Sequence, residues 1–228
     1  MAETRMMTHG FAIGLALATA LVPGRGTAHP HVFVDAGVEV AFDEDGRLAA
    51  LQVVWVYDEF YSMFAIDDYG FDREYTGNLT EDERAELTQI YSNWDEGFAG
   101  DLYVYAGGRR LDLSGPVSLQ ADYRDGRIIV AHTRALRERI AVGGDRVTIQ
   151  VYDPTYYVSY SLAGSPGIKG RGDCSAEVSG PDLEAAQARL ETELDALEAE
   201  GYDPWEIDAE FPEVGEAFAE TILVTCAS

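Results

Sequence analysis

Apolar and polar residues alternate along segment 31–42, near the start of the chain. The apolar face carries Val32, Val34, Val38, Val40 and Phe42, and the opposite face carries His31, Phe33, Asp35 and Glu39. A period of two is that of a β-strand with one buried face. Residues 47–57 are rich in Val, Trp and Tyr and follow the turn sequence Asp43-Glu44-Asp45-Gly46. The two segments are therefore predicted to pair as a hairpin.

The same β character returns in the second half of the chain. Short alternating or β-branched segments occur at 102–105, 117–123, 127–133, 146–152 and 157–162, with a last one at 218–226. Many short strands at this spacing predict a mainly β protein built as an antiparallel β-sandwich. The stretch 181–200 is acidic and places Leu and Ala on one helical face, so it predicts a C-terminal amphipathic helix.

Segment 58–100 has helical spacing and is predicted to be a helical hairpin inserted between the strands. Its middle fits the calcium loop of an EF-hand, with Asp72 first, Gly77 at the sharp turn and Glu83 last. The candidate calcium ligands are Asp72, Glu74, Thr76, Asn78 and Glu83. Glu74 and Thr76 stand where Asp or Asn is usual, which predicts weaker binding. The alternative is an ordinary hairpin in which Thr80 and Glu83 form a capping box.

The first 28 residues have the layout of a secretory signal peptide. Arg5 precedes an apolar run at 11–22, and Gly26 and Ala28 supply small residues before a cut after Ala28. The run is too short for a membrane helix, which takes roughly 20 residues, and no later stretch is apolar enough to insert. Residues 29–228 are therefore predicted to be one periplasmic domain that contains the inserted hairpin.

Two further features of composition limit the partners. The net charge of −25 repels nucleic acid, so no nucleic-acid partner is expected. Cys174 and Cys226 are the only cysteines, and export would place them in an oxidising compartment. One disulfide between them is predicted.

Three histidines remain after the predicted cut, and they are the candidate ligands of one transition-metal ion: His29, His31 and His132. Cleavage after Ala28 would give His29 a free α-amine, which can chelate a metal together with its own imidazole. Pro30 has no backbone N–H to offer as a ligand. Along a strand, His31 and Asp35 lie about 13 Å apart, so a carboxylate from a neighbouring strand is as good a candidate for a further ligand. The alternative for His132 is a packed or surface side chain.

Several stretches together resemble one family. They are His29-Pro30-His31-Val32-Phe33-Val34-Asp35, Tyr57-Asp58-Glu59-Phe60-Tyr61-Ser62, the loop at 72–83, Val151-Tyr152-Asp153-Pro154-Thr155-Tyr156, and Val224-Thr225-Cys226. The chain is similar to a bacterial periplasmic family of unknown function, often labelled the periplasmic component of an uncharacterised ABC-type transport system. Members tend to be encoded near nickel/cobalt or zinc transporters, and many carry a more acidic calcium loop. The resemblance implies a membrane metal transporter as partner.

Three functions are compatible with these observations. The first is a metal-binding accessory protein that holds copper, nickel, cobalt or zinc, since nitrogen ligands suit all four metals. The second is a copper enzyme with an N-terminal chelating histidine that cleaves polysaccharides oxidatively. The third is a structural or interaction domain without a metal. The sequence has no catalytic motif such as Gly-x-Ser-x-Gly or His-Glu-x-x-His, so we expect binding and not catalysis.

Overall fold

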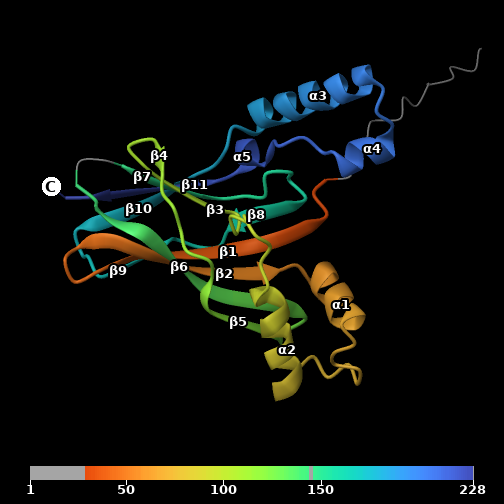
Figure 1. The fold of residues 1–228 in the computed structure, drawn as a ribbon, viewed down its shortest axis with the longest axis horizontal. Coiled ribbons are helices and arrows are strands. Elements are labelled where there is room, and N and C mark those ends of the chain that lie inside the picture. The colour runs from red at the N-terminus through yellow and green to blue at the C-terminus, as the bar shows by residue number, and fades with distance from the viewer. Residues whose placement is uncertain (1–28, 144–145, 228) are drawn as a thin grey trace, which may run out of the picture.

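The computed structural model describes residues 29–143 and 146–227, and it shows two β-sheets packed as a sandwich (Figure 1). The first sheet has the order β5-β6-β2-β1-β8, with β9 beside the end of β1. Its strands are β1 (Val32–Phe42), β2 (Arg47–Tyr57), β5 (Val117–Arg124), β6 (Arg127–Ala141), β8 (Val158–Leu162) and β9 (Gly167–Lys169). The mainly β fold class and the first hairpin are thereby confirmed.

The second sheet has the order β10-β11-β7-β3-β4. Its strands are β3 (Leu102–Ala106), β4 (Arg109–Arg110), β7 (Val147–Val151), β10 (Cys174–Ser179) and β11 (Thr221–Cys226). β10 and β11 pair antiparallel with Cys174 opposite Cys226, and the two cysteines form the predicted disulfide.

The sandwich is not antiparallel throughout, which corrects the sequence prediction. β8 and β9 run parallel to β1. The reason is the connection after β7, which crosses from the second sheet to the first and enters β8 beside the start of β1. His31 and Val32 both donate backbone hydrogen bonds to the carbonyl of Tyr157 there, at 2.9 and 3.2 Å. The two strands therefore start at the same end.

The alternating residues of β1 and β2 build the core as predicted. The even-numbered positions of β1 are buried, and the odd-numbered ones are exposed or half-buried. They pack with residues of the second sheet into one apolar cluster that includes the fully buried Leu51, Val104 and Ile149. Burial of the apolar surface in this cluster supplies most of the favourable free energy of folding.

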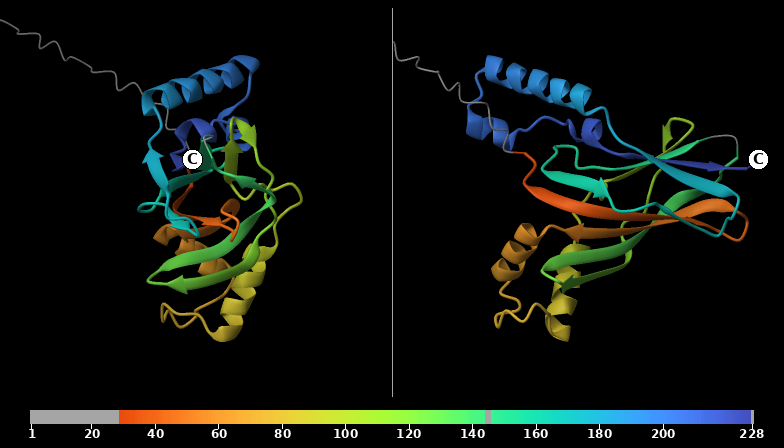
Figure 2. Two further views of the ribbon diagram at one scale, coloured as in Figure 1. Left: turned by 90° about the vertical axis from the view of Figure 1, so that its left-hand side faces the viewer. Right: turned by 180° about the vertical axis from the view of Figure 1, so that it is seen from behind.

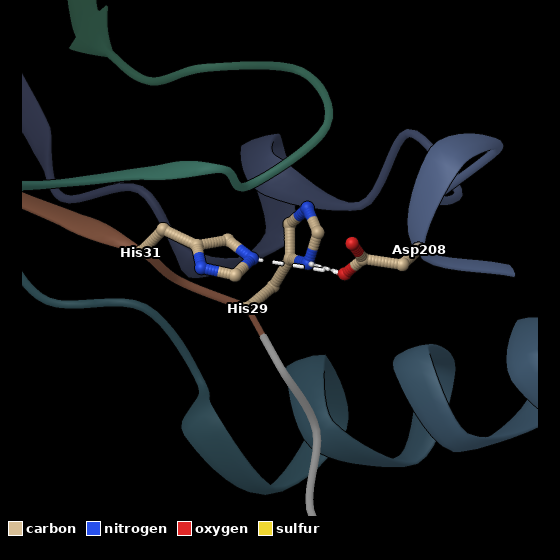
Figure 3. A group of neighbouring side chains, drawn as sticks. All are labelled: His29, His31 and Asp208. Atoms are coloured by element: carbon tan, nitrogen blue, oxygen red, sulfur yellow. Dashed lines mark ion pairs between the residues drawn. The ribbon is translucent and has the colours of Figure 1, made fainter. Parts of the chain in front are cut away.

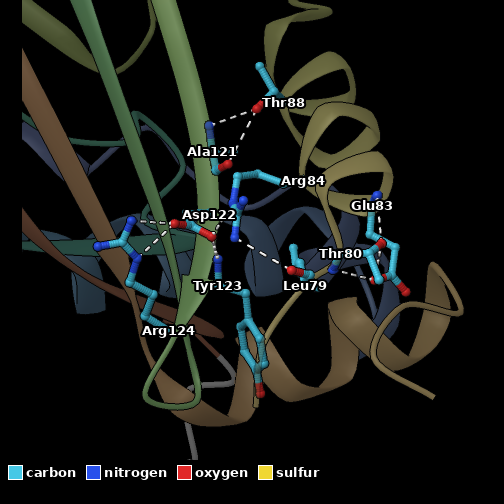
Figure 4. Close-up of polar contacts among 9 residues, drawn as sticks. All are labelled: Leu79, Thr80, Glu83, Arg84, Thr88, Ala121, Asp122, Tyr123 and Arg124. Carbon is cyan, nitrogen blue, oxygen red and sulfur yellow. Dashed lines mark hydrogen bonds and ion pairs between the residues drawn. The ribbon is translucent and has the colours of Figure 1, made fainter. Parts of the chain in front are cut away.

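The inserted segment forms two helices, α1 (Glu59–Asp68) and α2 (Glu81–Ser92), which lie beside β6 and β5 (Figure 2) and whose buried side chains join the core-facing residues of the first sheet. α2 is docked on β5 by polar contacts (Figure 4). The Arg84 guanidinium donates to Asp122 at 2.8 Å, and the Thr88 hydroxyl accepts from the backbone N–H of Ala121 at 3.0 Å. Leu87 on the same helix is fully buried.

The C-terminal region holds α3 (Leu183–Glu200), α4 (Pro204–Ala209) and α5 (Gly215–Phe218). α3 confirms the predicted helix and lies along the opposite side of the sandwich from α1 and α2 (Figure 2). α4 lies at the end of the molecule where β1 begins (Figure 1). Among the described residues, no helix is long and apolar enough to cross a membrane. The predicted signal peptide, residues 1–28, lies outside the described residues.

Candidate metal site

The loop between β7 and β8 fixes the backbone next to the first histidines. The carboxylate of Asp153 accepts hydrogen bonds from the backbone N–H groups of Thr155 and Val158, both at 3.0 Å. This closes the loop and places the carbonyl of Tyr157 against the N–H of His31. The Tyr157 ring then lies beside the His31 ring, with centroids 4.6 Å apart. The Asp-Pro-Thr-Tyr sequence therefore serves as the support of the His-Pro-His segment.

The same loop also holds the segment that follows α4. The backbone N–H of Gly215 donates to the carbonyl of Pro154 at 2.9 Å. The approach is so close that a Cβ on Gly215 would overlap the carbonyl oxygen of Asp153. Glycine is thus required at this contact for lack of a side chain. The N-terminal and C-terminal segments are brought together through one loop.

His29 lies in an aromatic setting between these segments. Its ring stacks on Phe211, with centroids 3.7 Å apart and planes 4° from parallel. Its side chain is only 2% exposed. Phe211 follows α4 closely in the sequence, so the stacking also positions that helix. A buried imidazole in a fixed orientation is what a metal site requires of a ligand.

Three side chains converge at this point: His29, His31 and Asp208 of α4 (Figure 3). Nδ1 of His29 lies 3.5 Å from Oδ1 of Asp208, and Nε2 of His31 lies 3.6 Å from the same oxygen. The three candidate ligand atoms all lie within 4.8 Å of one another. Ligands held at about 2.1 Å from a tetrahedral ion are about 3.4 Å apart, so the two nitrogen–oxygen spacings of 3.5 and 3.6 Å fit one shared metal ion.

The electrostatics of His29 favour a ligand role over an ion pair. Burial lowers the pKa of His29, and the neighbouring His31 lowers it further, against the opposing charges of Asp208 and Asp153. The ring is therefore neutral at neutral pH. Nδ1 has no hydrogen-bond partner among the described residues, and 3.5 Å is too long for such a bond. A cation between the lone pair and the carboxylate would satisfy both.

His132 lies elsewhere in the structure, so the predicted set of three histidines is not brought together. Its Cα pairs with Val53 of β2, which pairs with Val38 of β1. His31 precedes Val38 by seven positions, or about 23 Å along a strand. The His132 ring packs against Trp55 and Trp94, with centroids 4.6 and 5.4 Å away. His132 is therefore a packed histidine, the alternative named in the sequence analysis, because its side chain is buried in the core.

The candidate calcium loop uses its carboxylates for internal hydrogen bonds. Asp72 accepts from the backbone N–H groups of Thr76 and Gly77, at 2.7 and 2.8 Å. Glu83 accepts from the backbone N–H of Asp72 at 3.0 Å and completes the capping box with Thr80. In the described part of the chain, only the His29, His31 and Asp208 group brings three acidic or metal-binding side chains together in this way. The EF-hand-like hairpin is not confirmed, and calcium binding stays a prediction.

Asp208 is the candidate ligand that the sequence does not predict. Asp35, the nearest acidic residue to His31 on the same strand face, instead accepts a hydrogen bond from Arg127 at 2.9 Å. Asp208 comes from a short helix that begins with the sequence Asp203-Pro204, a cap followed by proline at the first helical position. That start signal was available in the sequence. Its position beside His29 was not, because it depends on the long-range contacts of the loop after β7.

Comparison with known protein families assigns the chain to a family whose function is unknown. The family model described as Protein of unknown function (DUF1007) matches residues 14–226, nearly the whole chain. No curated protein matches the chain. The chain therefore belongs to this family of unknown function.

Proposed function

For this member of a family of unknown function, we propose that the protein binds one divalent transition-metal ion through His29 Nδ1, His31 Nε2 and Asp208. The observation that carries the proposal is the convergence of these three ligand atoms from opposite ends of the chain. Two imidazoles and a carboxylate are a common zinc donor set, and imidazole also suits copper, nickel and cobalt. The hydrogen-bonded and stacked surroundings hold the ligands in place before the metal arrives.

The predicted export adds a fourth donor. The nitrogen of His29 that faces Asp208 is Nδ1, and this is the ring nitrogen that can close a six-membered chelate with the α-amine of its own residue. Cleavage after Ala28 would free that amine. We propose that the mature protein uses both nitrogens of His29, so that an uncut or extended chain binds more weakly.

The proposed role is to bind the metal ion in the periplasm and to work with a membrane metal transporter. Catalysis is not proposed. Support for the transporter comes from the resemblance of the motifs at 29–35, 57–62 and 151–156 to a family encoded near such transporters. In the structure, the motif at 29–35 hydrogen-bonds to the motif at 57–62 and to Tyr157, the residue that follows the motif at 151–156. Asp58 caps α1 by accepting from Tyr61 at 2.8 Å, and it also accepts from the N–H of Phe33 at 2.9 Å. The three motifs therefore meet around the start of β1.

Calorimetric titration with Zn(II) and Cu(II) tests the proposal. The proteins compared are the mature form, a form with one extra residue before His29, and the His31→Ala, Asp208→Ala and His132→Ala variants. Affinity should fall by roughly tenfold or more in the first three altered proteins, since each loses one ligand. His132→Ala should bind like the mature form. Equal affinity in all five proteins would refute the site.

A further inference from the structure

A second feature of the structure is a cavity that the metal site does not use. It has a volume of about 440 Å³ and lies between the first sheet and the inserted helices. Nine of its fourteen lining residues are aromatic, and we refer to it as the aromatic cavity. The rings that the argument uses are those of Trp55, Tyr57, Tyr61, Tyr91, Trp94 and Tyr160. The volume is within the range of small-molecule sites, about 300–1,000 Å³.

The ionisable acid and base side chains that line the aromatic cavity, as described, are all acidic, apart from tyrosine hydroxyls. The residues described as lining it include two carboxylates, Asp101 and Asp153, and no Lys, Arg or His. Asp101 is 6% exposed, and it accepts a hydrogen bond from the Tyr160 hydroxyl at 2.7 Å. The charge of Arg134 acts on Asp101, but the Arg134 side chain makes its hydrogen bonds to other groups. Its guanidinium stacks on Trp94 and donates to the carbonyls of Ser114 and Ala99, at 2.6 and 2.8 Å. Burial raises the pKa of Asp101 to about 7, so this carboxyl is partly protonated at neutral pH, and a cation bound beside it would favour the ionised form.

The residues of the aromatic cavity also carry polar groups that are weakly paired or unpaired in the described part of the chain. Nε1 of Trp55 is buried and has no hydrogen-bond acceptor in the described part of the chain. The hydroxyls of Tyr61 and Tyr91 are 3.4 Å apart, at the long limit of a hydrogen bond. Buried polar groups in native proteins are nearly always paired. Because Nε1 itself is buried, a ligand in the cavity would contact the Trp55 ring and not its N–H.

We propose that the aromatic cavity binds a small organic cation of the substituted-ammonium class. Rings of Trp and Tyr present electron-rich faces, which attract alkylated ammonium groups by cation–π interaction. Asp153, and Asp101 in its ionised form, supply the opposite charge. A hydrated metal ion fits this lining less well, because aromatic carbon offers it no ligands.

The aromatic cavity is separate from the metal site, although the two share a wall. Tyr157 lines the cavity, and its ring also contacts His31 on the metal side. Asp101, Trp55 and Tyr61 are not among the proposed metal ligands. The two sites can therefore be tested independently, and organic-cation binding is measured in protein freed of metal by a chelator.

The test is calorimetric titration of the metal-free full-length mature protein with choline and with 3,3-dimethyl-1-butanol. The alcohol has the same shape as choline but carbon in place of the charged nitrogen. We expect choline to bind and the alcohol to bind at least roughly tenfold more weakly, because the charge supplies the interaction. Equal binding of the two compounds, or no binding of choline, would overturn the proposal.

Two variants place the binding in the cavity. Asp101→Asn removes the charge, and asparagine tolerates the positive φ of 48° found at this position. Tyr61→Leu keeps an apolar side chain but removes a ring face. Each should weaken choline binding by roughly fivefold or more, while Glu44→Gln, in the exposed turn between β1 and β2, should not. Circular dichroism checks that each variant is folded, and unchanged choline affinity in both folded cavity variants would overturn the assignment to this cavity.

Discussion

Nδ1 of His29 and Oδ1 of Asp208 face each other at 3.5 Å although the two residues lie near opposite ends of the described chain. His29 precedes β1, and Asp208 lies on α4, near the C-terminus. A metal ion held by both would tie the C-terminal helices to the first strand. Metal binding should therefore be visible as a gain in stability.

We predict that Zn(II) raises the melting temperature of the mature protein. A ligand at about 100 times its Kd stabilises a folded protein by about 2.7 kcal/mol. Asp208→Asn should lose about half of this gain or more, because the amide brings no charge to the ion and a tenfold weaker site gives about 1.4 kcal/mol at the same Zn(II) concentration. The matched control is Glu210→Gln, just beyond the same helix. Thermal unfolding with and without Zn(II) measures the effect, and an equal shift in Asp208→Asn and the control would exclude Asp208 as a ligand.

We predict that Gly215→Ala destabilises the protein and weakens metal binding together. The new Cβ would overlap the carbonyl of Asp153, so the segment after α4 would have to move away from the loop that supports His31. The expected cost is about 1–3 kcal/mol, typical of overpacking. Gly172→Ala is the control, because its Cβ would meet no heavy atom within 4 Å. If urea unfolding finds both variants equally stable, the close contact has no structural role.

We predict that His132 makes the stability of the metal-free protein depend on pH. Burial, and then the charge of Arg134, lowers the pKa of His132 from 6.5 to about 4. Between these values the unfolded chain takes up a proton that the folded protein does not, so stability is present above pH 6.5 and is lost as pH falls. The loss attributable to His132 at pH 4.5 is about 2–3 kcal/mol.

His132→Phe checks this prediction, because phenylalanine keeps an aromatic ring beside Trp55 and Trp94 but cannot titrate. Urea unfolding at pH 7 and pH 4.5 gives the change in stability for each protein. The variant should lose less stability than the native protein by the amount above. Equal losses in the two proteins would show that His132 is not neutral in the folded state.

We predict that replacing both cysteines by serine costs the exported protein about 4 kcal/mol, the loop-closure value for a disulfide that spans 52 residues. Cys174 and Cys226 are directly opposed on neighbouring strands, so serine pairs should leave the strand pairing intact. Chemical unfolding of the native, reduced and double-serine proteins measures the difference. A cost below about 1 kcal/mol would mean that the cross-link adds little to this sheet.

The fold was predictable where the signal was local. The alternation from Val32 to Phe42 identified both the first strand and its buried face. The capping box of Thr80 and Glu83 marked the start of α2. The parallel pairing of β8 with β1 was not predictable, because it depends on a crossover between sheets. Residue spacing within a single strand says nothing about such a crossover.

About half of the candidate metal site was predictable from the sequence. His29 and His31 follow from their position after a predicted export signal, and the structure does bring them together. His132 is a candidate ligand from the sequence only because the chain has few histidines. Strand register places it far along the sheet from His31, where its ring packs against Trp55 and Trp94. Asp208 was hidden among 41 acidic residues. Asp208 differs from the other acidic residues only in its position beside His29 and His31 in the folded protein.

A crystal structure of the mature protein grown with Zn(II), with anomalous diffraction recorded on both sides of the zinc absorption edge, locates the ion itself. We predict one strong anomalous peak within about 2.2 Å of His29 Nδ1, His31 Nε2 and a carboxylate oxygen of Asp208. A strong peak only in the loop at 72–83, only beside His132, or at no ordered position would contradict the proposed site.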